Sequence, residues 1–172
     1  SKNNPLESGM SFINLLIVLA LLPCYALGQA ARGEDRSDAA GEALAVATRL
    51  FDAMRAKDAE AMRALFSAEG RLTATQWRDG QPSLRVYDGV AFAKLIVETK
   101  GVLRERMYKP ETLVSGDLAL VRGRYGFYVD DRFSHCGMNS FHLMRTADGW
   151  KIVSAASTIE LDGCEPEAKE RR

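Results

Sequence analysis

A pair of alternating hydrophobic runs lies near the C-terminal end of the chain, at residues 141–145 and 150–158. The segment between them contains Asp148-Gly149, and glycine readily adopts the positive φ that a tight hairpin turn requires. Alternation of apolar and polar residues predicts strands with one buried face. The sequence therefore predicts a β-hairpin, with Trp150 at the start of the returning strand.

The composition fits one globular domain, because 172 residues with 47% hydrophobic and 27% charged side chains can bury a single core. Lys plus Arg and Asp plus Glu are balanced at 23 each, whereas nucleic-acid binding favours a basic surface. Two histidines without a Cys-x-x-Cys pair are poor material for a metal site. The sequence also has no phosphate-cradling Gly-rich loop and no G-x-S-x-G motif. We expect no metal, no cofactor and no nucleic-acid partner.

The N-terminal segment differs from the rest of the chain. Residues 12–27 are almost entirely apolar and fall short of the roughly 20 residues that a transmembrane helix needs. This length predicts a signal peptide over residues 1–28 with cleavage before Gln29; residues 1–9 would be upstream sequence if Met10 is the start. A periplasmic or secreted protein without a membrane span would result. An uncleaved anchor and a buried helix are the alternatives.

Cleavage would leave Cys136 and Cys164, which an oxidising compartment allows to pair. If Thr146 lies opposite Trp150 in the closing hairpin, Cys136 lies opposite Glu160, four residues before Cys164. That separation is roughly 13 Å at about 3.4 Å per residue, too far for a disulfide unless Asp162-Gly163 turns the chain back. The pair either forms a bridge that pins the last strand or stays as two thiols.

Hydrophobic periodicity and turn residues predict the remaining elements. Asp58 is the expected N-cap of the second helix. Residues 29–41 read as a flexible leader and 161–172 as a charged, frayed tail. The predicted helices cover residues 40–56, 58–67 and 89–99, and the predicted strands cover 71–77, 84–87, 103–114, 118–129, 132–146 and 150–160. This order predicts an α+β fold with an antiparallel sheet.

Residues 56–66 (AKDAEAMRALF) and the hairpin at 141–158 carry a family resemblance. Over residues 42–160 the chain resembles the nuclear transport factor 2-like superfamily, which includes SnoaL-like cyclases and ketosteroid isomerases. The resemblance implies an α+β fold in which a cone-shaped, curved antiparallel sheet wraps around N-terminal helices and encloses a pocket. It also implies a homodimer formed by sheets packed back to back.

Strand alternation divides the long strands into two faces, because directly opposed residues share a face. Thr146 opposite Trp150 and Val129 opposite Arg132 give the expected register; a bulge at Gly137 would reverse the phase before it. The expected concave face holds Val121, Gly123, Tyr125, Phe127, Met138, Ser140, His142, Met144, Trp150, Ile152 and Ser154. The expected outer face, and dimer interface, holds Arg122, Arg124, Tyr128, Arg145 and Lys151, with His135 also pointing outward.

The best candidate for a functional residue is His142, because an imidazole can donate and accept protons near neutral pH. The alternative is a core histidine that is hydrogen-bonded to Ser154 or to a backbone carbonyl. The expected ligand pocket consists of Trp77, Tyr87, Tyr125, Phe127, Met138, His142 and Ser154.

Ketosteroid isomerase chemistry needs a general base and hydrogen-bond donors. By the resemblance, the isomerase's base falls at Ala74, its tyrosine at Leu50 and its second acid near Ser140 or Phe141, none of which can replace those groups. We therefore expect an exported protein that binds a small apolar or aromatic molecule or acts as an accessory module. The alternatives are a SnoaL-like cyclase, dehydratase or isomerase that uses His142 as acid and base, and an interaction protein with a filled cavity.

Overall fold

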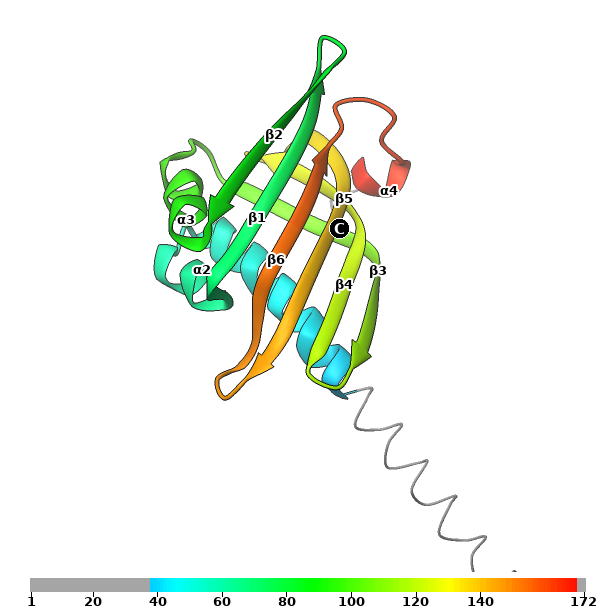
Figure 1. The fold of residues 1–172 in the computed structure, drawn as a ribbon. Coiled ribbons are helices and arrows are strands. Elements are labelled where there is room, and N and C mark those ends of the chain that lie inside the picture. The colour runs from blue at the N-terminus through cyan, green and yellow to red at the C-terminus, as the bar shows by residue number, and fades with distance from the viewer. Residues whose placement is uncertain (1–37, 170–172) are drawn as a thin grey trace, which may run out of the picture. The chain divides into compact units, whose positions relative to one another are not determined.

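The computed structural model describes residues 38–169 (Figure 1). The predicted signal peptide at 1–28 and most of the predicted leader lie outside the described residues. Between residues 38 and 169, no helix is both long and apolar enough to cross a bilayer.

Three helices precede or interrupt the first strands: one over 38–56, α2 (Ala59–Leu65) and α3 (Gly89–Glu98). Lys57, with φ of 55°, ends the first helix. The Asp58 carboxylate then caps α2 by accepting from the Ala61 amide at 2.9 Å, as predicted. Asp88 caps α3 in the same way, at 2.8 Å from the Ala91 amide.

Six strands form one sheet in the order β2-β1-β6-β5-β4-β3. Neighbouring strands are antiparallel except β1 and β6, which are parallel. The strands are β1 (Phe66–Arg78), β2 (Gln81–Asp88), β3 (Leu103–Ser115), β4 (Leu118–Val129), β5 (Arg132–Thr146) and β6 (Gly149–Ile159). All six predicted strands are present, and β1 begins five residues earlier than expected.

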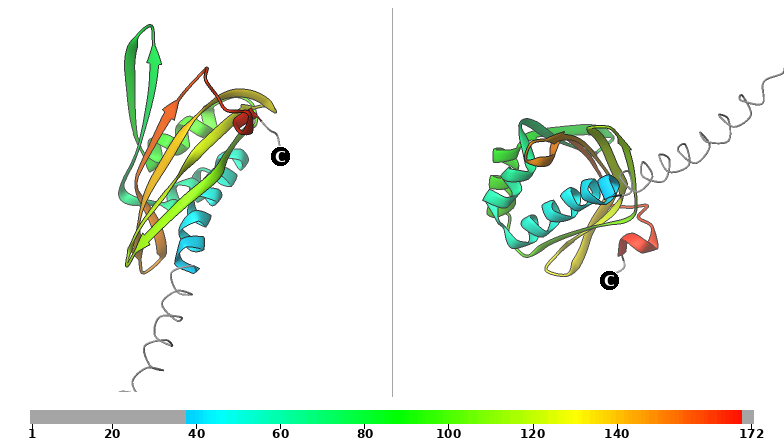
Figure 2. Two further views of the ribbon diagram at one scale, coloured as in Figure 1. Left: turned by 90° about the vertical axis from the view of Figure 1, so that its right-hand side faces the viewer. Right: turned by 90° about the horizontal axis from the view of Figure 1, so that it is seen from below.

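The sheet curves around the first helix (Figure 2). Residues at helical spacing on that helix, such as Val46 and Leu50, are fully buried against the concave face, where they meet Leu143 and Ile152. The chain therefore has the predicted α+β cone, with its core between the helices and the sheet.

Two bulges make part of the predicted register wrong. Val129 pairs with Arg132 as expected, but Phe127 pairs with His135, which leaves Ser134 as an extra residue in β5. At the closing hairpin, Thr146 pairs with Gly149 and Arg145 with Trp150, so the expected pairing of Thr146 with Trp150 is one residue out.

The second bulge, at Val153 in β6, restores the predicted pairing of His142 with Ser154. Because a bulge shifts the alternation by one, the inward residues of β5 after Ser134 are the odd-numbered ones. The exposed side chains of Met138, His142, Met144 and Ser154 therefore lie on the outer face, and their predicted concave position is wrong. The bulge in β5 that changes which residues face inward lies at Ser134, and not at Gly137, where the sequence analysis allowed for one.

The C-terminal segment is folded where a frayed tail was expected. Cys136 pairs with Glu160, Gly163 (φ of 66°) reverses the chain, and Cys136 and Cys164 form a disulfide with 5.8 Å between their Cα atoms. The bridge confirms the predicted pair. Helix α4 (Pro166–Lys169) follows and buries Ala168.

Helix α4 covers residues expected at a dimer interface. The Tyr128 hydroxyl is buried and donates to the Ala168 carbonyl at 2.6 Å. Arg124 is bound to Glu160 at 3.2 Å. Lys151 donates to the Ala64 carbonyl at 2.8 Å. Arg145 lies in the inward phase of β5, where it pairs with Glu42 of the first helix at 3.3 Å and packs 4.6 Å from the Trp150 ring centroid, so its predicted outer position is wrong. These contacts occupy side chains that the sequence placed on a free surface.

Candidate functional site

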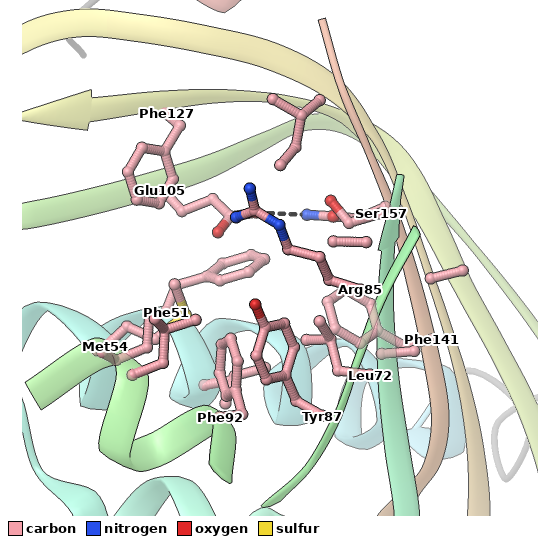
Figure 3. Close-up of a pocket in the computed structure, with 18 of the residues that line it drawn as sticks. Phe51, Met54, Leu72, Arg85, Tyr87, Phe92, Glu105, Phe127, Phe141 and Ser157 are labelled. Carbon is pink, nitrogen blue, oxygen red and sulfur yellow. Dashed lines mark hydrogen bonds between the residues drawn. The ribbon is translucent and has the colours of Figure 1, made fainter. Parts of the chain in front are cut away.

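A cavity of about 180 Å³ lies between the helices and the concave face of the sheet (Figure 3). The first helix and α3 supply its apolar floor, because their buried stripes face the sheet. The apolar lining comprises Leu50, Phe51, Met54, Leu72, Ala74, Phe92, Leu95, Ile96, Phe127, Phe141, Ala155, Ala156 and Ile159. The polar lining comprises Arg85, Tyr87, Glu105, His135, Asn139 and Ser157.

The mouth of the cavity lies at β2 and α3, where the lining residues Arg85 and Leu95 are exposed. Arg85 and Tyr87 are two residues apart on β2, so alternation directs both to the concave side. Figure 3 shows Arg85 and Glu105 reaching into the same space, near the rings of Phe51 and Tyr87.

Glu105 brings a carboxyl group into this apolar setting. It alternates on β3 with Arg104 and Arg106, and it shares the inward phase with buried Leu103. Asn139 Nδ2 donates to Glu105 Oε1 at 2.5 Å. Burial raises the pKa of Glu105 from 4.5 to about 7, and the bond from Asn139 opposes that rise. The carboxyl group is therefore close to half protonated at neutral pH.

His135 is the second titratable group of the cavity. Its ring stacks on Phe127 with centroids 4.6 Å apart and meets the Tyr125 ring edge-on at 5.8 Å. The Ser134 hydroxyl lies 3.0 Å from Nδ1. Burial lowers the pKa of His135 to about 4, so the imidazole is neutral at pH 7. The prediction that His135 points outward is wrong, because the bulge at Ser134 reverses its phase.

Ser157 and Tyr125 complete the polar side of the cavity. The Tyr125 hydroxyl donates to the Thr158 carbonyl at 2.7 Å, and the Ser157 hydroxyl donates to the Tyr125 oxygen at 3.4 Å. Burial, with the nearby Glu105 carboxyl as a smaller cause, raises the pKa of Tyr125 above its usual range. Tyr125 therefore acts as a neutral hydrogen-bonding anchor.

The structure brings together only part of the predicted pocket. Tyr87 and Phe127 line the cavity, and Tyr125 lies directly behind its wall. Trp77 is 66% exposed on the β1–β2 hairpin, which projects beyond the rest of the sheet (Figure 2). The predicted pocket residues on the outer face are Met138, His142 and Ser154. The structure therefore does not support a role for His142 inside the cavity.

Sequence reasoning missed Glu105, His135, Asn139 and Arg85. One available signal was the run Leu103-Arg-Glu-Arg-Met107, where a carboxyl occupies the apolar phase of an alternating strand. Leu50, Ala74 and Phe141, at or near the positions that the resemblance aligns with the isomerase's catalytic groups, line the cavity with apolar side chains.

Among residues 38–169, no group of three His, Cys, Asp or Glu side chains is arranged to hold a metal ion. The site is thus a mostly apolar cavity with one ionisable carboxyl, one neutral imidazole and a few hydrogen-bonding groups.

A cone with a cavity inside it defines a class of small α+β proteins. The family model of the SnoaL-like domain matches residues 43–159, and the chain belongs to this family within the NTF2-like (nuclear transport factor 2-like) superfamily. Among curated proteins, none matches the sequence.

Solved structures show the same fold. An NTF2-like protein with a cystatin-like fold from Novosphingobium aromaticivorans is 21% identical, with a TM-score of 0.54 over 94% of this chain and 97% of that one. A cystatin-like fold protein from Burkholderia xenovorans is 22% identical, with a TM-score of 0.53 over 73% and 94%. A proposed dehydratase of the NTF2-like family from Streptomyces avermitilis is 15% identical, with a TM-score of 0.55 over 72% and 96%. At these identities, the likeness establishes the fold alone.

Proposed function

We propose that the protein binds a small, largely apolar molecule, about the size of one aromatic ring, in the cavity of the cone. The observation that supports this function is the cavity itself, about 180 Å³ in volume and walled mainly by aromatic and aliphatic side chains. An apolar cavity of about 150 Å³ is large enough to bind benzene. The few polar groups would fix the orientation of the ligand, as in most small-molecule sites.

A titration with toluene and indole, followed by NMR chemical shifts, tests this function. Ala74 lines the cavity on β1, and Ala74→Leu should fill part of the space and weaken binding at least tenfold. Thr75→Leu on the same strand points to the other face and serves as the matched control. Shifts confined to the outer face, or equal binding by both variants, would argue against the cavity as the site.

A proton-transfer enzyme is the second candidate, and the raised pKa of Glu105 supports it. A general acid or base is most effective when its pKa lies near the working pH, and that of Glu105 is about 7. Glu105 replaces His142 as the candidate acid and base. Incubation with a metabolite extract should yield a product that the Glu105→Gln variant does not form. Unchanged extracts with the wild-type protein would leave binding as the function.

We propose further that the protein is exported to the periplasm or secreted. The disulfide Cys136–Cys164 supports this, because disulfides persist in oxidising compartments. Native mass spectrometry of the periplasmic fraction should find a chain that begins near Gln29 and is two hydrogens lighter than the reduced form. Recovery of an uncleaved chain from the membrane fraction would contradict export.

A homodimer is proposed through the outer face of the sheet. Exposed apolar side chains on this face support it: Leu84, Val86, Leu113, Leu118, Met138 and Met144. Light scattering should show a dimer that Val86→Asp converts to a monomer. Val90→Asp, on exposed α3, is the matched control. A monomeric wild-type protein would refute the proposal.

A further inference from the structure

We infer that the cavity selects an organic cation, namely a protonated amine carried on a compact aromatic or aliphatic body, with its N–H groups directed to Glu105. This inference rests on the proposed binding function and adds the chemical class of the ligand. It is carried by the hydrogen-bond partners, the charges and the rings that surround Glu105.

Three hydrogen bonds of the polar side use protein donors and leave acceptors around Glu105. Asn139 Nδ2 donates to Glu105, the Tyr125 hydroxyl to the Thr158 carbonyl, and the Ser157 hydroxyl to Tyr125. A hydroxyl has one proton to donate, so Ser157 retains only lone pairs. Glu105 Oε1 accepts from Asn139. The lone pairs of the Glu105 carboxylate and of Ser157 can accept further N–H or O–H donors from a ligand.

The charges around Glu105 favour a ligand that is positive as well. Three carboxylates on or beside the sheet are paired with arginine: Glu111 lies 2.7 Å from Arg122, Glu160 lies 3.2 Å from Arg124, and Asp131 lies 3.1 Å from Arg104. Within the described part of the chain, the hydrogen-bond partner of the Glu105 side chain is the neutral amide of Asn139. The neutral imidazole of His135 supplies no cation either. An ammonium group would supply the missing countercharge.

The aromatic walls also suit a cation. The faces of aromatic rings carry negative potential, so they attract ammonium groups as well as apolar surfaces. The rings that line the cavity are Phe51, Tyr87, Phe92, Phe127 and Phe141. Arg85 also reaches into this space (Figure 3), but the residue is exposed, so solvent weakens its repulsion of an entering cation.

Binding of a cation should depend on the ionisation of Glu105. The titratable and charged groups that face it are Tyr125, His135, Tyr87 and Arg85, together with Asp52 and Arg55 of the first helix, which line an adjoining groove with it. Between pH 5.5 and 8, His135 stays neutral while Glu105 gains its charge. The ionised fraction of Glu105 rises from about 3% to about 90% over this range.

Calorimetric titration with benzylamine and with uncharged benzyl alcohol tests the inference. Benzylamine should bind about 30-fold more tightly at pH 8 than at pH 5.5, because it requires the carboxylate. Benzyl alcohol should bind more weakly at pH 8 and show no such rise. Glu105→Gln should weaken benzylamine at least tenfold at pH 8 and remove its pH dependence. Glu111→Gln, an exposed carboxylate on the same strand, should change neither.

Benzyl alcohol binding as tight as benzylamine, or benzylamine binding that is independent of pH, would overturn the inference and leave the cavity as a ligand site. Failure of both compounds to bind would overturn the proposed function as well. The pH dependence of the wild-type protein decides the question even if Glu105→Gln does not fold.

Discussion

Asn139 on β5 and Glu105 on β3 are joined by a hydrogen bond of 2.5 Å that reaches across the intervening strand β4. The bond opposes the effect of burial on the carboxyl group, because it favours the ionised form. Burial thus dominates the pKa of Glu105, and a contact between two strands that are not neighbours in the sheet opposes it.

Removing this bond should raise the pKa of Glu105. In Asn139→Ala the carboxylate loses its donor while its burial remains, so its pKa should move above the present value of about 7. Carbon-13 NMR of the glutamate carboxyl groups measures the shift. Ser140→Ala, on the opposite face of the same strand, is the control. A pKa that stays the same or falls in Asn139→Ala would show that the bond is not formed in solution.

Glu105 and His135 should have opposite effects on stability as the pH changes. The folded-state pKa of Glu105 is raised, so its contribution is fully present below pH 4.5 and is lost as the pH rises to about 7. The folded-state pKa of His135 is lowered, so its contribution is present above pH 6.5 and is lost as the pH falls to about 4. Between pH 4.5 and 6.5 the two contributions to the free energy of unfolding change in opposite directions with pH. Their pH dependences therefore nearly cancel in the wild-type protein.

Glu105→Gln should expose the contribution of His135. Relative to the wild-type protein, the free energy of unfolding of this variant should rise with pH between about 4.5 and 7. At pH 8 the gain should reach about 1–3 kcal/mol, since half-burial and solvent reduce the full effect of the pKa shift. Urea denaturation at several pH values measures it. A constant difference between the two proteins would mean that the carboxyl group is not desolvated.

His135→Phe should have the reverse pH dependence. Phenylalanine keeps the stacking on Phe127 but does not titrate. Relative to the wild-type protein, the variant should gain stability as the pH falls from about 6.5 to 4, because no imidazole has to stay neutral in the folded state. The same urea series provides the measurement. If the free energies of unfolding of the two proteins changed in parallel with pH, His135 would be solvated rather than buried in the cavity wall.

Replacing both cysteines of the bridge by serine should destabilise the protein by about 3–4 kcal/mol, from the chain entropy of a loop of 28 residues. Thermal unfolding of Cys136→Ser/Cys164→Ser measures the loss. Treatment of the wild-type protein with a reductant should give the same change, which separates the effect of the bridge from that of the serines. Equal stability of the oxidised and reduced forms would contradict the prediction.

Gly126 should not tolerate a side chain. A Cβ at this position would overlap the Ala168 carbonyl oxygen, so Gly126→Ala must displace α4. We expect a loss of about 2–4 kcal/mol by overpacking and the broken Tyr128 hydrogen bond. Gly41→Ala meets no atom within 4 Å in the first helix and should stabilise by up to about 1 kcal/mol. Thermal unfolding compares the two, and a neutral Gly126→Ala would show that α4 is not docked.

The sequence was sufficient to predict the elements and the cone, because periodicity, the Asp58 cap and the Asp148-Gly149 turn are local signals. It was not sufficient to predict which residues of β5 face the cavity. A bulge depends on how two strands pair, and Ser134 and Val153 carry no distinctive residue type. The phase error put His142 inside and His135 outside.

The remaining errors have a similar cause. Glu105 was overlooked because a glutamate between two arginines resembles a solvated strand, and only the sheet shows which of the three points inward. The disulfide was predicted as one of two possibilities, because its formation depends on the path of the chain after Glu160.

The bridge from Cys136 to Cys164 also limits which part of the convex surface is open to other molecules. It anchors α4 over β3 and β4, where Tyr108 and Tyr128 are withdrawn from solvent. Helix α4 thus covers one end of the outer face of the sheet. Exposed apolar side chains remain on the β2-β1-β6 side, at Leu84 and Val86, whereas a single covalent bond ties α4 over the other end of the same face.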